Sequence, residues 1–194
     1  MTTTTPLLKP SDHTAELVAF VETLALTPSD APTACRGWTA HELVAHLVAG
    51  AEEMADLVSL ELAGSASRPT RSFASREAPW RRLPDAEMRD ALFVEGARLI
   101  EALDALHDLD PERTVLFTGW RMTATQLATH TRSELVVHRW DLVGDDETGR
   151  SLAAQAELLV HAGAALHHMP TLAEARRSVR PDDDLLAAWG RRGR

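Results

Sequence analysis

Two residues of opposite chemical character lie one helical turn apart in the segment HTRSELVVHRWDLVG, residues 130–144. They are Glu134 and His138. Residues four positions apart share one face of a helix, so this carboxylate and this imidazole point the same way. Leucines occupy the same face, which predicts that it is turned toward a core. A carboxylate in that position is costly unless a cation pairs with it.

A divalent metal ion is one such cation, because a histidine and a carboxylate at this spacing can bind a single ion. Two ligands do not complete a site, so a third must come from another helix. His46, in the segment GWTAHELVAHLVAG, is the best candidate because it borders the apolar stripe of its predicted helix. His130, one turn before Glu134, is an alternative ligand. Histidines expected to be solvated or to serve only in packing are His41, His107, His161, His167 and His168.

An arginine is the other cation that can neutralise Glu134, and it would make a metal unnecessary. Arg132, Arg139 and the arginines of residues 64–84 are the candidates. Asp141 shares the face of Glu134. We place it in the catalytic site, where it can orient a metal-bound histidine; a local cap or ion pair is the alternative.

Three further residues have simpler interpretations. Cys35 is the only cysteine, so neither an intrachain disulfide nor a cysteine-based zinc site is expected. A single cysteine is most often a small buried apolar residue. Trp38 and Trp140 are predicted to pack in the interior, each with its indole N–H satisfied by one hydrogen bond.

The composition of the chain limits its class. It has 194 residues, 44% of them hydrophobic and 25% charged, which is typical of one globular domain. The net charge of −9 argues against nucleic acid as a partner, because phosphate binding needs a basic face. No apolar run approaches about 18 residues, so we expect no membrane partner and a cytoplasmic location. A small-molecule substrate is the expected partner, and a homodimer is left open.

Helical periodicity, interrupted by proline and glycine, predicts an all-α fold. Ser11 or Asp12 is expected to cap the first helix, whereas Thr39 and Glu42 form a capping box at the second. The predicted helices cover residues 11–26, 39–63, 85–109, 123–144 and 151–168.

The connections between these helices differ in length. Residues 64–84 contain three prolines and five arginines without any period, which predicts a long crossover loop. The segment TVLF, residues 114–117, is expected to be extended, and GDDETGR, residues 144–150, is expected to be a turn. DDDLLAAWG, residues 182–190, can add a short helix. The pattern indicates a four-helix bundle with one long crossover and an additional C-terminal helix.

Two sequence motifs occur in a characteristic order along the chain, GWTAHELVAHL at residues 37–47 and then SELVVHRWDL at residues 133–142. They resemble the DinB-like superfamily and, more closely, the mycothiol-dependent maleylpyruvate isomerase family. The resemblance covers about residues 10–168 and implies a single metal-binding four-helix bundle over residues 1–194, with residues 170–194 as a tail. The long connection would lie between helices two and three.

The resemblance also implies a chemistry. The metal ligands would be His46, Glu134 and His138, the ion zinc, and the cosubstrate mycothiol, a sugar-linked cysteine derivative. The isomerase of that family has a further C-terminal domain that contributes to its active site, whereas this sequence ends about 25 residues after the fifth helix. We therefore expect an isomerase or thiol transferase that acts on a small electrophilic metabolite, without assigning the substrate.

Two other functions remain open from the sequence. The same metal site can serve an enzyme that needs no external thiol, such as a hydrolase or a cyclisation or rearrangement enzyme. It can also belong to a binding module without catalysis. The arginines of residues 68–82 can recognise a carboxylate-bearing substrate through bidentate contacts, or can simply be solvated.

Overall fold

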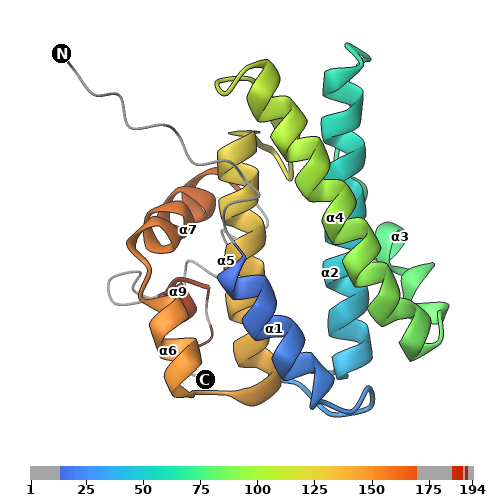
Figure 1. Ribbon diagram of the computed structural model, residues 1–194, viewed down its shortest axis with the longest axis vertical. Helices are drawn as coiled ribbons and strands as arrows, with labels where there is room; N and C mark the ends of the chain where they lie inside the picture. The colour runs from blue at the N-terminus through green and yellow to red at the C-terminus, as the bar shows by residue number, and fades with distance from the viewer. Residues whose placement is uncertain (1–13, 170–184, 190, 192–194) are drawn as a thin grey trace.

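The computed structural model describes residues 14–169, 185–189 and 191. It is mostly helical with one small two-stranded sheet, so the prediction of an all-α fold of the DinB-like type is confirmed (Figure 1). None of the described helices is both long and apolar enough to cross a membrane. The four main helices are α1 (Ala15–Ala25), α2 (Ala40–Leu62), α4 (Asp85–Leu109) and α5 (Ala124–Val143).

The start of α2 is fixed by its own sequence. The Thr39 side chain accepts a hydrogen bond from the backbone N–H of Glu42, and the Glu42 side chain accepts one from the N–H of Thr39. This predicted capping box is confirmed. At α1 the N-cap is Thr14, which makes no side-chain cap bond; the predicted caps Ser11 and Asp12 lie outside the described residues.

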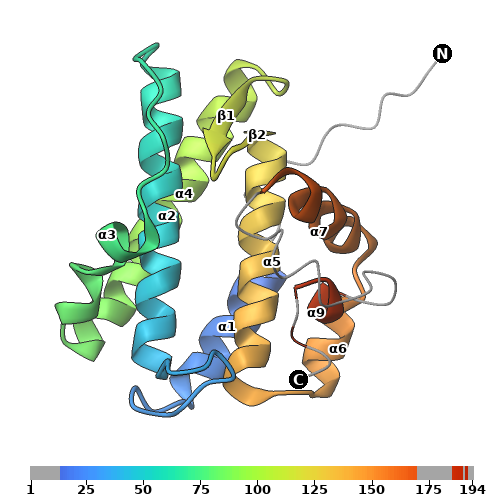
Figure 2. The same ribbon diagram turned by 180° about the vertical axis from the view of Figure 1, so that it is seen from behind.

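The connection between α2 and α4 is a crossover, because the two helices run in the same direction and the chain must return along the bundle (Figure 2). It contains two short elements that sequence periodicity did not reveal, α3 (Phe73–Glu77) and the 3-10 turn η2 (Trp80–Arg82). The fully buried Glu53 of α2 holds the segment in place. Its carboxylate accepts hydrogen bonds from the Arg68 side chain at 3.1 Å and the Arg71 backbone N–H at 2.7 Å.

A hairpin precedes α5. The predicted extended segment is β1 (Thr114–Phe117), and it pairs antiparallel with β2 (Trp120–Thr123), a strand that the sequence analysis missed. Thr118 and Gly119 form the turn with φ angles of +49° and +89°. Positive φ at both turn residues matches the twist of the flanking strands.

Helix α5 lies centrally, with α1, α2 and α4 on one side and α7 on the other (Figures 1 and 2). Its start is again a capping box, in which Thr123 and Gln126 exchange hydrogen bonds. It ends at Gly144, whose φ of +74° is a left-handed conformation that glycine adopts without strain.

The C-terminal part differs from the prediction. Residues 144–150 are not simply a turn, and the helix expected over residues 151–168 is two helices, α6 (Glu147–Ala153) and α7 (Ala156–His168). Asp146 starts α6 because its carboxylate accepts a hydrogen bond from the backbone N–H of Gly149 at 2.6 Å. The short helix expected near residue 186 is present as α9 (Leu185–Ala188), where Leu185 and Leu186 are buried.

Candidate metal centre

Three side chains from two helices converge inside the bundle. His46 comes from α2, and Glu134 and His138 come from α5. The Nε2 atoms of His46 and His138 lie 3.5 and 3.3 Å from Oε2 of Glu134, and the two imidazole centroids are 5.1 Å apart. One ligand atom from each residue can be chosen so that all three lie within 4.8 Å of one another. This spacing permits all three to bind one ion.

Two further carboxylates form hydrogen bonds with the histidines at the ring nitrogens that do not face Glu134. Glu77 of α3 accepts a hydrogen bond from Nδ1 of His46 at 2.7 Å, and Asp141 of α5 accepts one from Nδ1 of His138 at 2.9 Å. A carboxylate can only accept, so each Nδ1 carries the hydrogen. Both Nε2 atoms are thereby turned toward Glu134. Carboxylates commonly orient metal-binding histidines in this way.

The charges of the site favour a cation at its centre. Burial alone would raise the pKa of Glu134, but hydrogen bonds from His138 and His46 outweigh it and hold this pKa well below its usual range. Burial would lower the pKa of His138, but hydrogen bonding to Asp141 and Glu134 raises it well above its usual range. Glu134 is thus ionised, and the positive charge beside it is carried by protonated His138. That charge can be removed, because a histidine can release its proton.

The arginines considered as partners of Glu134 are engaged elsewhere. Arg132 donates to Glu16 at 2.8 and 3.0 Å, and Arg139 donates to Asp146 at 2.6 and 2.8 Å. No arginine forms an ion pair with Glu134 among the residues that the structure describes. Histidines are its only ion-pair partners in that part of the chain.

Cys35 is not simply a packing residue, which corrects the sequence interpretation. Its thiol donates to Oδ2 of Asp141 at 3.2 Å, and Arg191 binds both oxygens of Asp141 at 2.8 and 2.9 Å. Cys35, His138 and Asp141 form a second grouping with metal-ligand spacing. Because Arg191 already neutralises Asp141, the grouping around Glu134 is the better cation site.

His130 lies beside the site without joining either grouping. Its Nε2 atom is 3.9 Å from Oε1 of Glu134, and its Nδ1 atom is 3.2 Å from Nε2 of His161. Burial lowers the pKa of His130 and, to about 3, that of His161. The two rings are therefore neutral and hydrogen-bonded to each other.

The sequence predicts that Trp38 and Trp140 pack in the interior, each with one hydrogen bond from its indole N–H. Trp38 packs against the site, with its ring 5.3 Å from the ring of His46. Trp140 packs against a hydrophobic core cluster as expected, but its buried Nε1 has no hydrogen-bond partner within the described part of the chain. The prediction of one satisfying hydrogen bond for Trp140 is therefore wrong.

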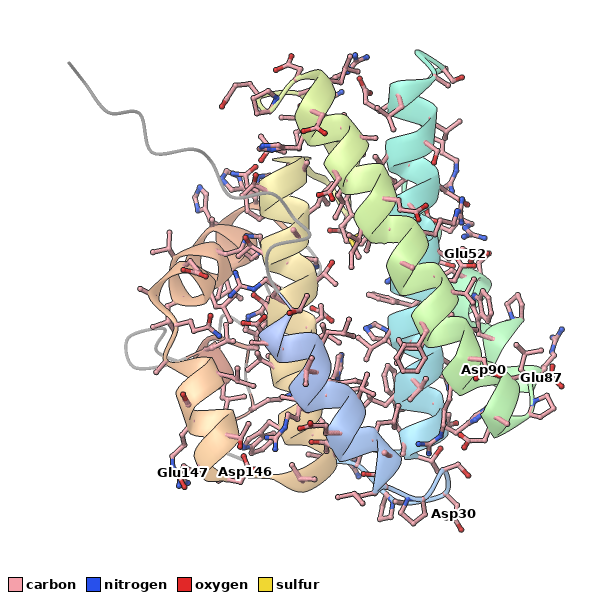
Figure 3. The ribbon with its side chains drawn as sticks, viewed as in Figure 1. Asp30, Glu52, Glu87, Asp90, Asp146 and Glu147 are labelled. Carbon is pink, nitrogen blue, oxygen red and sulfur yellow. The ribbon has the colours of Figure 1, made fainter. Side chains whose placement is uncertain are left out.

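Two of the converging side chains, His46 and Glu134, line a cavity of about 150 Å³. The polar part of its lining includes these two residues and His130, and leucines, Ile100, Met54 and aromatic rings form much of the remaining wall. Unlike Glu134, the acidic residues Asp30, Glu87 and Glu147 lie on the outside of the bundle (Figure 3). An apolar cavity with a few convergent polar groups is the usual form of a small-molecule site.

Comparison with known proteins identifies a family and a similar fold. Residues 11–143 match the family model of the mycothiol maleylpyruvate isomerase N-terminal domain. Two similar solved structures are crystal structures of the mycothiol-dependent maleylpyruvate isomerase and of a histidine-to-alanine mutant of it. Each is 18% identical with a TM-score of 0.63, over 82% of this chain and 72% of that chain. At this identity the likeness shows the fold alone. No curated protein matches the sequence significantly.

Proposed function

We infer the function from one premise: the chain belongs to the mycothiol maleylpyruvate isomerase N-terminal domain family. We propose that it is a metal-dependent, mycothiol-using isomerase or thiol transferase for a small electrophilic metabolite. The observation that carries this proposal is the convergence of His46, Glu134 and His138, whose ligand atoms lie within 4.8 Å of one another beside an apolar cavity.

The donor set fits a catalytic zinc ion. Two imidazole nitrogens and one carboxylate oxygen are three protein ligands, which leave a fourth position for a substrate atom. A thiol bound at a zinc ion held by His46, Glu134 and His138 would have a lowered pKa, so that mycothiol would be present as its thiolate near neutral pH.

The chain's own residues prepare this reaction. Glu77 and Asp141 fix the orientation of the two histidines, and Asp141 is in that sense a positioning residue for catalysis. The apolar wall excludes water and holds the electrophile beside the thiol. Addition of the thiol sulfur to a carbon–carbon double bond, rotation about the resulting single bond and loss of the thiol give an isomerisation. Retention of the new carbon–sulfur bond gives a transfer.

Metal analysis followed by thiol assays tests the proposal. We expect about one zinc per chain. We also expect the purified protein to require mycothiol at catalytic level for isomerisation of a maleyl-type double bond, or to consume it stoichiometrically in a transfer. Protein that contains no metal after refolding with zinc would contradict the metal site. Zinc-loaded protein that turns over electrophiles without thiol would indicate a metal enzyme of another class.

A further inference from the structure

Arg76 of α3 is a buried cation without a partner among the residues that the structure describes. The residue is 3% exposed, and its Nε and Nη1 atoms are buried and make no hydrogen bond to that part of the chain. Its guanidinium forms no ion pair with any described residue. The guanidinium carbon instead lies 4.4 Å from the ring centroid of Phe73 and 5.9 Å from that of Phe117.

This arrangement costs stability unless something else binds the guanidinium. Burial lowers the pKa of Arg76, and the attraction of Glu77, Glu53 and Glu134 offsets that effect only in part. An arginine nevertheless stays protonated in proteins, so the charge persists inside the molecule. A buried charge without a hydrogen-bonded partner is the least favourable state of such a group.

Thr118 and Trp189 line the same cavity as Arg76. The hydroxyl of Thr118 and the indole N–H of Trp189 are buried and have no hydrogen-bond partner among the described residues. Thr118 is also held at a φ of +49°, which is strained for a threonine, while its backbone N–H donates to Thr70 Oγ1 at 2.8 Å. Strained residues concentrate at binding sites. Three segments distant in sequence thus bring residues with unused donors to the lining of one cavity.

The charged residues that line this cavity indicate the charge of the ligand that would pair with Arg76. Its other charged lining residues are Arg132, which is paired with Glu16 and Glu157, and Glu134, which faces the histidines. Among the described residues that line it, Arg76 is therefore the charge without a counter-ion. Its occupant must be an anion with an apolar body, because the remaining wall is mostly hydrocarbon.

We propose that Arg76 binds a carboxylate of the substrate, with the Thr118 hydroxyl as an additional donor. The proposal rests on the proposed function and makes the electrophile a carboxylic acid. The planar guanidinium pairs with a carboxylate through two parallel hydrogen bonds. One cation in a small apolar cavity matches a carboxylate with a single charge better than a doubly charged phosphate. Arg76 is thus a specificity residue beside the candidate metal centre.

Calorimetric titration with benzoate and benzamide tests this assignment. A benzene ring suits an apolar cavity of about 150 Å³, and the amide differs from the acid mainly in charge. Zinc-loaded and metal-free protein are titrated in parallel, because a carboxylate can also bind a zinc ion directly. The variants are Arg76→Met and Arg76→Lys, and the matched control is Arg82→Met, which changes an exposed arginine of the same crossover.

We expect wild-type protein to prefer benzoate to benzamide in both metal states. Arg76→Met should weaken benzoate binding by roughly tenfold or more, Arg76→Lys by less, and Arg82→Met not at all. Thermal unfolding separates binding from structure. Arg76→Met should unfold at the same or a higher temperature than wild type, and benzoate should stabilise wild type but not this variant.

Several results would overturn the proposal. The first two are the absence of benzoate binding at millimolar concentration and equal benzoate binding by wild type and Arg76→Met. The others are benzoate binding that requires zinc and is unchanged by substitution of Arg76, and tighter binding of phenylphosphonate than of benzoate. The metal-free arm does not depend on the metal centre. Loss of zinc or thiol dependence alone would contradict only the proposed function.

Discussion

Glu53 and Glu134 are both carboxylates inside the helical bundle, but their partners differ in kind. Glu53 is fully buried and held by Arg68 and Arg71, and these bonds outweigh the effect of burial and lower its pKa to about 2. Glu134, with a side chain 21% exposed, faces His46 and His138 instead. An arginine keeps its charge, whereas a histidine can release its proton.

The difference separates a structural ion pair from an exchangeable one. The arginines around Glu53 connect the crossover to α2 and already supply the positive charge that this carboxylate needs. His138, beside Glu134, can lose a proton to solvent and offer the freed Nε2 to a metal. The two glutamates are therefore expected to respond differently to substitution, zinc and pH.

The largest expected effect is on zinc binding. His138→Ala should weaken zinc affinity more than about a hundredfold, beyond the loss typical for outer-sphere residues, because it removes a ligand. The helical content should persist, since the core is elsewhere. Competition with a chromophoric chelator gives the affinity. His41→Ala, a change on the polar side of α2, is the control and should keep wild-type affinity. Stoichiometric zinc in His138→Ala would refute the site.

Glu53→Gln should act on stability instead. It should lower the free energy of unfolding by about 2–3 kcal/mol and leave zinc affinity unchanged. The loss is smaller than for a fully buried pair, because Arg68 and Arg71 are about one-third exposed and can be solvated. Urea unfolding measures it. The neighbouring Glu52→Gln, at a carboxylate 27% exposed, should cost less than about 1 kcal/mol. Equal losses would remove the distinction between the two glutamates.

The carboxylates behind the histidines should have intermediate effects. Glu77→Gln and Asp141→Asn are each expected to weaken zinc binding by roughly 10- to 100-fold, because the Nδ1 hydrogens lose their charged acceptors. Asp85→Asn is the matched control: Asp85 faces Nδ1 of His41, which is not a proposed ligand, at 3.4 Å. Zinc titration of the three variants decides the matter. If Asp85→Asn weakens binding as much as the others, the effect is one of net charge.

The smallest expected effect is the pH dependence of the metal-free protein. The pKa of Glu53 is lowered from 4.5 to about 2, so its contribution is complete above pH 4.5 and is lost as the pH falls through 2. The pKa of His138 is raised, so its contribution is complete below pH 6.5 and is lost as the pH rises through the higher folded value.

Urea unfolding between pH 2 and pH 10 measures both losses. Glu53→Gln should flatten the acid side, and His138→Ala should flatten the alkaline side, by about 1 kcal/mol or more. The contribution of His138 to the free energy of unfolding should fall as the pH rises. Zinc affinity should rise over the same range, because the proton that competes with zinc for His138 leaves. An alkaline loss that persists in His138→Ala would show that another group is responsible.

The sequence by itself determined the parts of the molecule that depend on local spacing. The capping boxes at Thr39 and Thr123 mark where α2 and α5 begin, because the cap partners are only three residues apart. The face shared by Glu134 and His138 follows from helix geometry alone. The bounds of α4 also follow from its periodicity.

Tertiary structure decided which distant groups meet. Glu77 lies in a five-residue helix, too short to show a period, and only the returning crossover brings it to His46. Arg76 and Thr118 are 42 positions apart in sequence and line one cavity through the docking of a loop and a hairpin turn. Within a helix, local geometry fixes the direction of neighbouring side chains. The position of a connecting segment depends instead on the charged groups and aromatic rings that it contacts when it packs. Those partners become known only when the chain is folded.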